Sequence, residues 1–186
     1  MSPFLRRFFY FFNKYFMVPL FRLGMGPFFG NPFTGYIMVL KLMGRKTGRI
    51  RYTPVNYAFR NGNVYCISGA GKSSDWYHNL LANPAIEVIL PTQAISGHVE
   101  EVTDLIERHL VIRPILKNAG FAGFLEGYNP YTISDDELVR KTSGLPVLRI
   151  RPNGIGNGPS DPGGWVWMWI PIVIVLIILI LVAMIG

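Results

Sequence analysis

The chain has 186 residues, of which 50% are hydrophobic and 16% charged, and its 18 Lys and Arg outnumber its 11 Asp and Glu. That length suits one domain with appendages, and the low charged fraction is typical of a protein that contacts a membrane. The single cysteine, Cys66, excludes an intramolecular disulfide. The three histidines are scattered without metal-ligand spacing, so we assign no metal site.

Residues 1–23 are predicted to form an amphipathic helix at a membrane interface. On a helical wheel one arc is apolar and holds Phe4, Leu5, Phe8, Phe11, Phe12, Tyr15 and Phe16. The opposite arc is polar and holds Arg6, Arg7, Asn13 and Lys14. Such a helix places aromatic rings at the headgroup boundary and its basic face on anionic lipid. Pro19 is expected to end or kink it.

Residues 24–152 show the mixed pattern of an α+β domain with short strands. Alternating apolar runs predict strands at Tyr36–Leu42, Arg51–Arg60, Val64–Ser68, Ala85–Leu90, Ser96–Val102 and Pro146–Arg151. Helices are predicted at Asp75–Ala82, at about Asp104–Asn118 and after Ser134, which begins a capping box with Glu137. The strands outnumber what a doubly wound fold would need and lack regular crossover helices, which argues against that fold.

A basic turn lies between the first two predicted strands. It runs from Gly44 to Arg51 and carries Arg45, Lys46, Arg49 and Arg51. Residues 1–74 contain eleven Lys and Arg and no Asp or Glu, so no acid close in sequence neutralises the turn. Arginine forks and a lysine suit phosphate or carboxylate oxygens, which predicts an external anion as the partner.

A glycine-rich loop follows the third predicted strand. Gly69-Ala70-Gly71-Lys72-Ser73 lacks the first glycine of a phosphate-binding P-loop, because Cys66 occupies that place. The loop leads into the helix Asp75–Ala82, and backbone N–H groups there can line a planar ring or a phosphate.

The order GRKTG, R-x-TP-x-x-Y, SGAGK and DWYHNL-x-ANP resembles the deazaflavin-dependent nitroreductase family, relatives of the flavin-binding split β-barrels. The resemblance covers roughly Gly24 to Pro152. It implies an FMN-binding-like split β-barrel and coenzyme F420, a deazaflavin with a polyglutamate tail. The residues that it assigns to cofactor binding are Arg45, Lys46, Thr47, Gly48, Arg51, Pro54, Ser68, Gly69, Ala70, Gly71, Lys72 and Trp76.

The chemistry implied by the resemblance is transfer of a hydride from the reduced deazaflavin to an apolar acceptor, a quinone or a nitroaromatic compound. A proton must reach the acceptor as well, and the candidate donors are Ser68, Tyr128 and Tyr131. The segment from Phe121 to Tyr131 is rich in aromatic residues and is expected to form an apolar substrate wall.

The C-terminal part is predicted to anchor the domain. Residues 165–185 form an uncharged apolar run whose length at about 1.5 Å per residue matches the bilayer core, which predicts a transmembrane helix. Residues 153–164 are rich in Gly and Pro and predict a flexible linker. Basic residues precede the span, so we expect a single-pass C-terminal anchor in the cell membrane with the domain in the cytoplasm.

Two other functions stay open from the residues alone. The first is an FMN-binding protein or oxidoreductase on the same barrel, and the second is a non-enzymatic module that binds the anionic lipid of a bilayer. Nucleic acid is not predicted as a partner, because the basic segment lacks a recognised binding motif. The oligomeric state is left open.

Overall fold

The computed structural model describes residues 3–30, 35–124, 129–160 and 166–185. At its centre is a closed six-stranded barrel in the order β1-β2-β3-β6-β5-β4, and every neighbouring pair is antiparallel. The strands are β1 (Ile37–Met43), β2 (Ile50–Arg60), β3 (Asn63–Ile67), β4 (Ala85–Ile89), β5 (Ala94–Glu101) and β6 (Val147–Ile155). The predicted α+β barrel is therefore confirmed.

Alternation along the strands divides the apolar residues between the inside and the outside of the barrel. The interior core contains Met38, Leu40, Val64, Leu148 and Ile150, each without exposed surface. The opposite faces of β2, β3 and β6 pack against the helices described next. Because the side-chain period of a strand is two, one strand can serve both cores.

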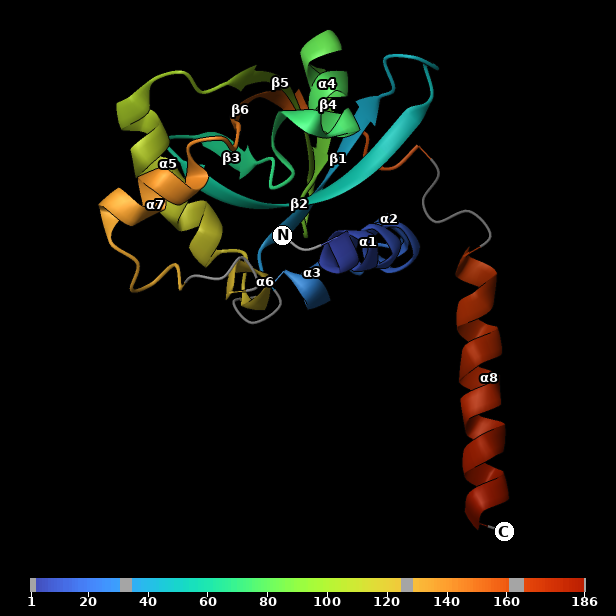
Figure 1. Ribbon diagram of the computed structural model, residues 1–186. Helices are drawn as coiled ribbons and strands as arrows, with labels where there is room; N and C mark the ends of the chain where they lie inside the picture. The colour runs from blue at the N-terminus through green and yellow to red at the C-terminus, as the bar shows by residue number, and fades with distance from the viewer. Residues whose placement is uncertain (1–2, 31–34, 125–128, 161–165, 186) are drawn as a thin grey trace.

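Helices are distributed unevenly around the barrel, and one of them contributes side chains to its interior core (Figure 1). They are α4 (Asp75–Ala82), α5 (Leu105–Lys117), α6 (Phe121–Phe124) and α7 (Asp135–Thr142), with a short 3₁₀ turn η2 (Gly71–Ser73). Helices α5 and α7 bury Val111, Ile112, Ile115 and Leu138 against Tyr65 and Val147 of the barrel. The predicted capping box is present, since the Ser134 hydroxyl accepts the Glu137 N–H at 3.3 Å.

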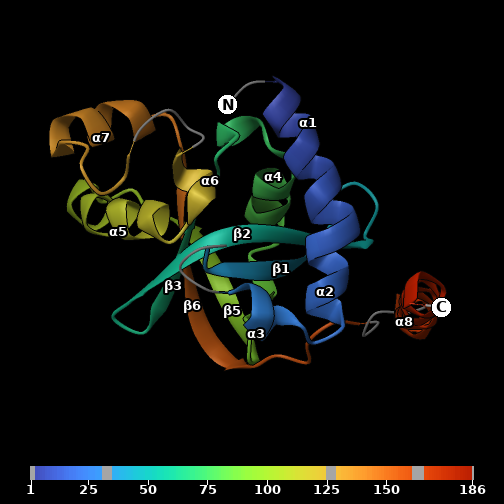
Figure 2. The same ribbon diagram turned by 90° about the horizontal axis from the view of Figure 1, so that it is seen from below.

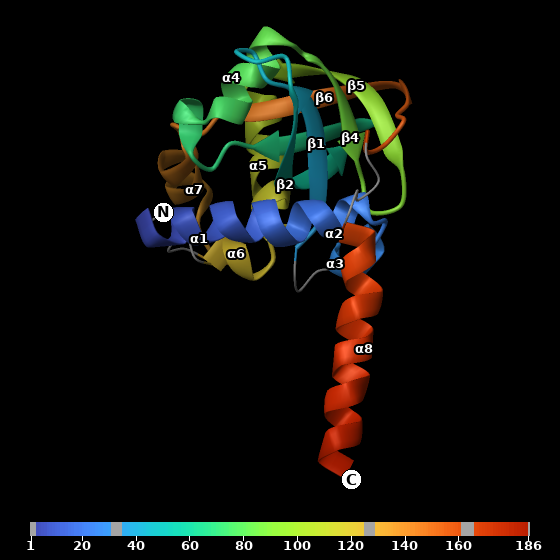
Figure 3. The same cartoon turned by 90° about the vertical axis from the view of Figure 1, so that its right-hand side faces the viewer.

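The N-terminal segment is helical from Pro3 to Arg22 and lies across one side of the barrel (Figures 2 and 3). It consists of α1 (Pro3–Phe12), a π-helical turn η1 (Asn13–Met17) and α2 (Val18–Arg22), followed by the short α3 (Gly26–Phe29). The helix continues through Pro19 and ends at Arg22, before Gly24 with its φ of 78°. Proline has no backbone N–H to donate inside a helix. The π-helical turn before Pro19 accommodates this missing hydrogen bond.

Helix α8 (Val166–Ile185) contains most of the run that we predicted to span a membrane, and its side chains from Ile172 to Met184 are mostly exposed. Nevertheless, within the part of the chain that the structure describes, no helix combines the length and the apolar character needed to cross a membrane. The predicted transmembrane helix at 165–185 is therefore wrong. The prediction of a single-pass cell-membrane anchor with a cytoplasmic domain is wrong for the same reason. The first rested on the length and composition of the apolar run and the second also on the basic residues before it, and both required a helix that could span the bilayer.

The predicted linker at 153–164 begins inside the barrel. Strand β6 continues to Ile155, and Gly156 donates its N–H to the Ala94 carbonyl at 3.0 Å. Beyond it, Lys41 Nζ donates to the Gly158 carbonyl at 2.8 Å, and the Ser160 N–H donates to the Tyr52 hydroxyl at 2.9 Å. These contacts hold residues 156–160 against β1 and β2.

Candidate functional site

The basic turn is the hairpin that joins β1 to β2. Gly44 receives the Gly48 N–H at 2.8 Å and donates its own N–H to the Arg49 carbonyl at 2.9 Å. Gly48 has a φ of 64°, a left-handed conformation that favours glycine. Two glycines thus fix a tight tip from which the cationic side chains project.

Arg45 does not extend into solvent from this tip but binds the start of α4. Its Nη2 lies 2.8 Å from Asp75 Oδ1, and its Nη1 donates to the Asp75 carbonyl at 3.0 Å and to Asn79 Oδ1 at 2.9 Å. The Arg45 backbone N–H also donates to Asn79 Oδ1 at 3.1 Å. Arg45 holds the pKa of the Asp75 carboxyl below its usual value. The hairpin is therefore tied to α4.

The other three cations of the hairpin are Lys46, Arg49 and Arg51, and all are exposed. Among the described residues, none of them takes part in an ion pair within 4.0 Å. Arg51 pairs in register with Leu42, whose side chain belongs to the interior core, so Arg51 lies on the inner face of β2 at the barrel mouth. This trio supplies positive charge that no ion pair with a described residue engages.

The loop after β3 is shaped by hydrogen bonds of its own serines. Ser68 is fully buried, and its hydroxyl lies 2.8 Å from both the Gly71 carbonyl and the Ser74 hydroxyl. Gly71 has a φ of 67°, and a Cβ built on Gly69 would meet nothing within 4 Å. Gly69 and Ala70 are exposed, so their backbone is open to a ligand.

Lys72 and Trp76 connect this loop to the barrel. Lys72 Nζ lies 3.1 Å from Glu101 Oε1, and Glu101 also accepts the Tyr77 hydroxyl at 2.5 Å. Burial and the Glu101 carboxylate raise the pKa of Tyr77 to about 12. Trp76 is half-buried and packs with Val55 against the interior core. Trp76 thus lies at the interior core, the core that also contains Leu42, the cross-strand partner of Arg51, and Lys72 ties the loop to β5.

Pro54 lies on the other face of β2. It pairs in register with Val39, which packs outside the barrel with Met17 and Phe21 of the N-terminal helix. Residues three apart in a strand point to opposite faces. The structure therefore separates Pro54 from Arg51 and places its ring toward the N-terminal helix.

Of the predicted proton donors, Tyr128 lies outside the described residues. Tyr131 is 57% exposed, and its ring stacks on Phe124 at 6.3 Å with the Lys117 ammonium 5.2 Å from its centroid. Phe124 and Tyr131 thus form an aromatic surface beside the end of α5. Ser68 differs from Tyr131, because its hydroxyl is buried and already hydrogen-bonded.

Sequence reasoning missed the three residues that organise the site, Asp75, Asn79 and Glu101. Asp75 is the first acid of the chain and follows the loop directly, which was the available signal. Nothing local marks Glu101, whose partners Lys72 and Tyr77 are more than twenty positions earlier.

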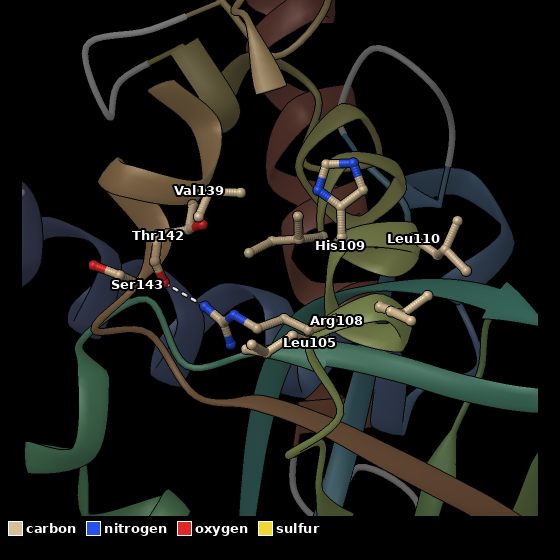
Figure 4. Close-up of a pocket in the computed structure, with 9 residues that line it drawn as sticks. Leu105, Arg108, His109, Leu110, Val139, Thr142 and Ser143 are labelled. Atoms are coloured by element: carbon tan, nitrogen blue, oxygen red, sulfur yellow. Dashed lines mark hydrogen bonds between the residues drawn. The ribbon is translucent and has the colours of Figure 1, made fainter. Parts of the chain in front are cut away.

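A hollow of about 480 Å³ lies elsewhere, between α5 and α7 (Figure 4). Its wall is mostly apolar, and Arg108 donates across it to the Thr142 carbonyl. The residues around it are Leu105, Ile106, Arg108, His109, Leu110, Ile112, Val139, Thr142 and Ser143. None of the predicted site residues belongs to this wall.

A barrel of this kind, with a cationic hairpin beside a glycine-containing loop, is what the resemblance to deazaflavin-binding proteins led us to expect. The model of the F420H(2)-dependent quinone reductase family matches residues 21–128, more than half of the chain. The chain belongs to this family. Its description names an oxidoreductase that uses reduced F420, in agreement with the predicted enzyme class and coenzyme, and it does not name FMN.

Individual proteins match different shares of the chain. The F420H(2)-dependent quinone reductase Rv1261c of Mycobacterium tuberculosis is 42% identical over 55 residues, which span 27% of this chain and 36% of that protein. A solved F420-H2 dependent reductase, FDR-A, is 24% identical over 61% of this chain and 92% of its own, with a TM-score of 0.41. The conserved hypothetical protein Rv2991 of M. tuberculosis is 16% identical over 63% and 72%, with a TM-score of 0.47.

Proposed function

We propose that this chain is an F420H2-dependent oxidoreductase that reduces a quinone-like acceptor. Family membership supports the reaction class. In the balanced reaction one hydride and one proton convert a quinone to its quinol, and the reduced coenzyme supplies the hydride. The observation that carries the proposal is the exposed trio Lys46, Arg49 and Arg51 at the barrel mouth.

The residues at the mouth fit a ligand with an aromatic head and an anionic tail. Lys46, Arg49 and Arg51 would hold phosphate and carboxylate oxygens through charge-assisted hydrogen bonds. The open backbone at Gly69 and Ala70 and the half-buried Trp76 would line the flat ring. The coenzyme supplies the hydride chemistry, while the protein binds, orients and excludes water.

Coenzyme titration tests this assignment. Lys46→Ala and Arg51→Ala should each weaken F420 binding by about ten- to a hundredfold, since a hydrogen bond to a charged group contributes about 1.5–3 kcal/mol. Arg60→Ala is the matched control, because Arg60 is also exposed and lies at the opposite end of the same strand. If Lys46→Ala and Arg51→Ala bind F420 as tightly as Arg60→Ala and the wild type do, the proposed tail site is wrong.

The acceptor is proposed to be apolar, and a nitroaromatic compound is an alternative acceptor for the same hydride. Phe124 and Tyr131 supply a stacked aromatic surface that suits a flat apolar molecule. Turnover of reduced F420 with a menaquinone-like, a water-soluble quinone and a nitroaromatic acceptor distinguishes these classes. Faster turnover with the water-soluble quinone than with the menaquinone-like acceptor would contradict the proposed preference for an apolar acceptor.

A separate proposal concerns a lipid surface as partner of the N-terminal helix. Phe8, Tyr10, Phe11, Tyr15 and Phe16 are between 44% and 63% exposed, and Arg7 and Lys14 lie over neighbouring rings. Exposed aromatic residues with adjacent cations suit the headgroup region of anionic lipid. Sedimentation with anionic vesicles should be reduced by Phe11→Ser and Phe16→Ser but not by Phe59→Ser, which removes an exposed ring of β2. Equal sedimentation of all three would contradict the proposal.

A further inference from the structure

We propose that Arg45, Asp75 and Asn79 form a clasp that positions the cationic hairpin for the anionic tail, and that Arg45 is itself no ligand of the tail. This inference rests on the proposed coenzyme site and divides its cations into two roles. Arg45 was grouped with the ligands on sequence alone, and its contacts favour a positioning role.

The guanidinium of Arg45 is already occupied. Three hydrogen bonds of 2.8–3.0 Å join it to Asp75 and Asn79, and only 25% of the side chain is exposed. A guanidinium has five N–H donors in one rigid plane, so binding along one edge of the fork fixes the orientation of the whole group. Arg45 would have to break its hydrogen bonds with Asp75 and Asn79 before the same N–H groups could bind a second anion.

The local charge also disfavours Arg45 as a tail ligand. Asp75 Oδ1 lies 2.8 Å from Arg45 Nη2, so an incoming carboxylate or phosphate would approach a like charge. Lys46, Arg49 and Arg51 have no such carboxylate within 4.0 Å among the described residues. The anion is therefore directed toward these three side chains and away from Arg45.

The clasp has a rigid base. Helix α4 buries Tyr77 and Leu80 in the interior core at 3% and 1% exposure, and Asn79 is 8% exposed. The hairpin tip has no comparable core of its own, since residues 46–51 are all exposed. Tying the tip to α4 pre-orders the three free cations, and pre-ordering a binding group strengthens binding by lowering its entropy cost.

The sign of the Asp75→Ala effect distinguishes the two roles. If Arg45 gripped the tail, removing the neighbouring carboxylate would free the guanidinium and strengthen F420 binding. For a clasp, the same change loosens the hairpin and weakens binding by roughly two- to tenfold. Asp75→Ala also removes a carboxylate that would repel the anionic tail, and this second effect strengthens binding. A net weakening of F420 binding is therefore the more demanding outcome for the clasp. The matched control is Asp136→Ala, which removes an exposed acid from the first turn of α7.

Salt titration and rescue add a second readout. The slope of log Kd against log salt grows with the number of ion pairs that the ligand makes. Arg45→Ala should weaken binding with the wild-type slope, whereas Lys46→Ala should lower the slope. Arg45→Lys cannot restore the fork and should recover little affinity. A reduced slope in Arg45→Ala would overturn the clasp.

Amide hydrogen exchange without coenzyme tests the clasp independently of the proposed function. Asp75→Ala and Arg45→Ala should each accelerate exchange at the hairpin amides of Gly44 and Gly48, which are hydrogen-bonded within the hairpin, and leave β3 and β6 unchanged. Unchanged exchange at the hairpin would overturn the clasp even where F420 binds. Failure of the wild type to bind F420, with accelerated exchange in both variants, would instead reject the coenzyme assignment and keep the clasp.

Discussion

At the scale of single residues, the hydroxyl groups of the candidate proton donors differ in how free they are to react. Ser68 is buried and bonded to Gly71 and Ser74, so its hydroxyl shapes the loop. Tyr131 is exposed, and no hydrogen bond of its hydroxyl to a described residue is found. A proton donor must reach the acceptor, which favours Tyr131 over Ser68.

Replacing Tyr131 with Phe keeps the ring and removes the hydroxyl. If Tyr131 delivers the proton, kcat with a quinone should fall by about 10²–10⁴-fold while the Kd for F420 stays constant. Stopped-flow oxidation of the reduced coenzyme measures both quantities. Ser68→Ala should instead weaken F420 binding more than it lowers kcat, because it removes the bonds that hold the loop.

Wild-type turnover in Tyr131→Phe would move proton delivery to Tyr128 or to water. A fall in kcat without a change in Kd in Ser68→Ala would reassign the donor to Ser68 itself.

At the scale of elements, charges join β5 and β6 to α5. Arg149 lies 2.7 Å from Glu100 Oε1 and 2.6 Å from Glu107 Oε1, and Arg151 also contacts Glu100. Glu107 in turn accepts the Tyr65 hydroxyl at 2.7 Å. Arg149 and Arg151 hold the pKa of Glu100 below its ordinary value of 4.5. This network connects β5 and β6 to α5, a helix that packs mainly on β2 and β3.

The lowered pKa of Glu100 gives a pH dependence with a defined sign. Its stabilising effect is fully present above the unfolded-state pKa of about 4.5 and is lost as pH falls through the lower folded-state value. Urea unfolding between about pH 7 and about pH 3 should show this loss. Glu100→Gln should be less stable near neutral pH and should depend less on pH across the acid range. Identical acid profiles for variant and wild type would contradict this assignment.

The sequence predicted elements better than it predicted their partners. Local alternation located all six strands, and the start of α4 and the Ser134 cap were read directly from residue types. The placement of β6 between β3 and β5 depends on contacts between distant residues, which no local pattern encodes. The site follows the same division, because the hairpin and loop are local motifs whereas Arg45 meets its partner Asp75 thirty positions away.

At the scale of the whole molecule, the N-terminal helix is part of the folded unit. Met17 and Phe21 are 2% and 3% exposed and pack on Val39 and Ile89 outside the barrel. Arg22 also lies over the Tyr52 ring, whose hydroxyl receives the Ser160 N–H. The first helix, the outer face of β1 and β2 and the segment after β6 thus meet on one side.

Phe21→Ala should therefore lower the free energy of unfolding by about 3–5 kcal/mol, the usual cost of truncating a buried phenylalanine. Phe28→Ala is the matched control, because Phe28 is 74% exposed and should change stability by less than about 0.5 kcal/mol. Urea unfolding followed by circular dichroism measures both. Similar small effects in the two variants would show that the helix is only loosely attached.

The position of β6 also affects how the chain folds while it is being synthesised. Strands β1 to β5 precede it, yet β3 and β5 are joined only through β6, which lies between them and pairs with both. A ribosome releases the chain from its N-terminus, so β3 and β5 each emerge with one unpaired edge and keep it until residues 147–155 arrive. Unpaired edges attract other strands. Nascent chains that stall before β6 should therefore be ready clients for chaperones, and those released after it should not.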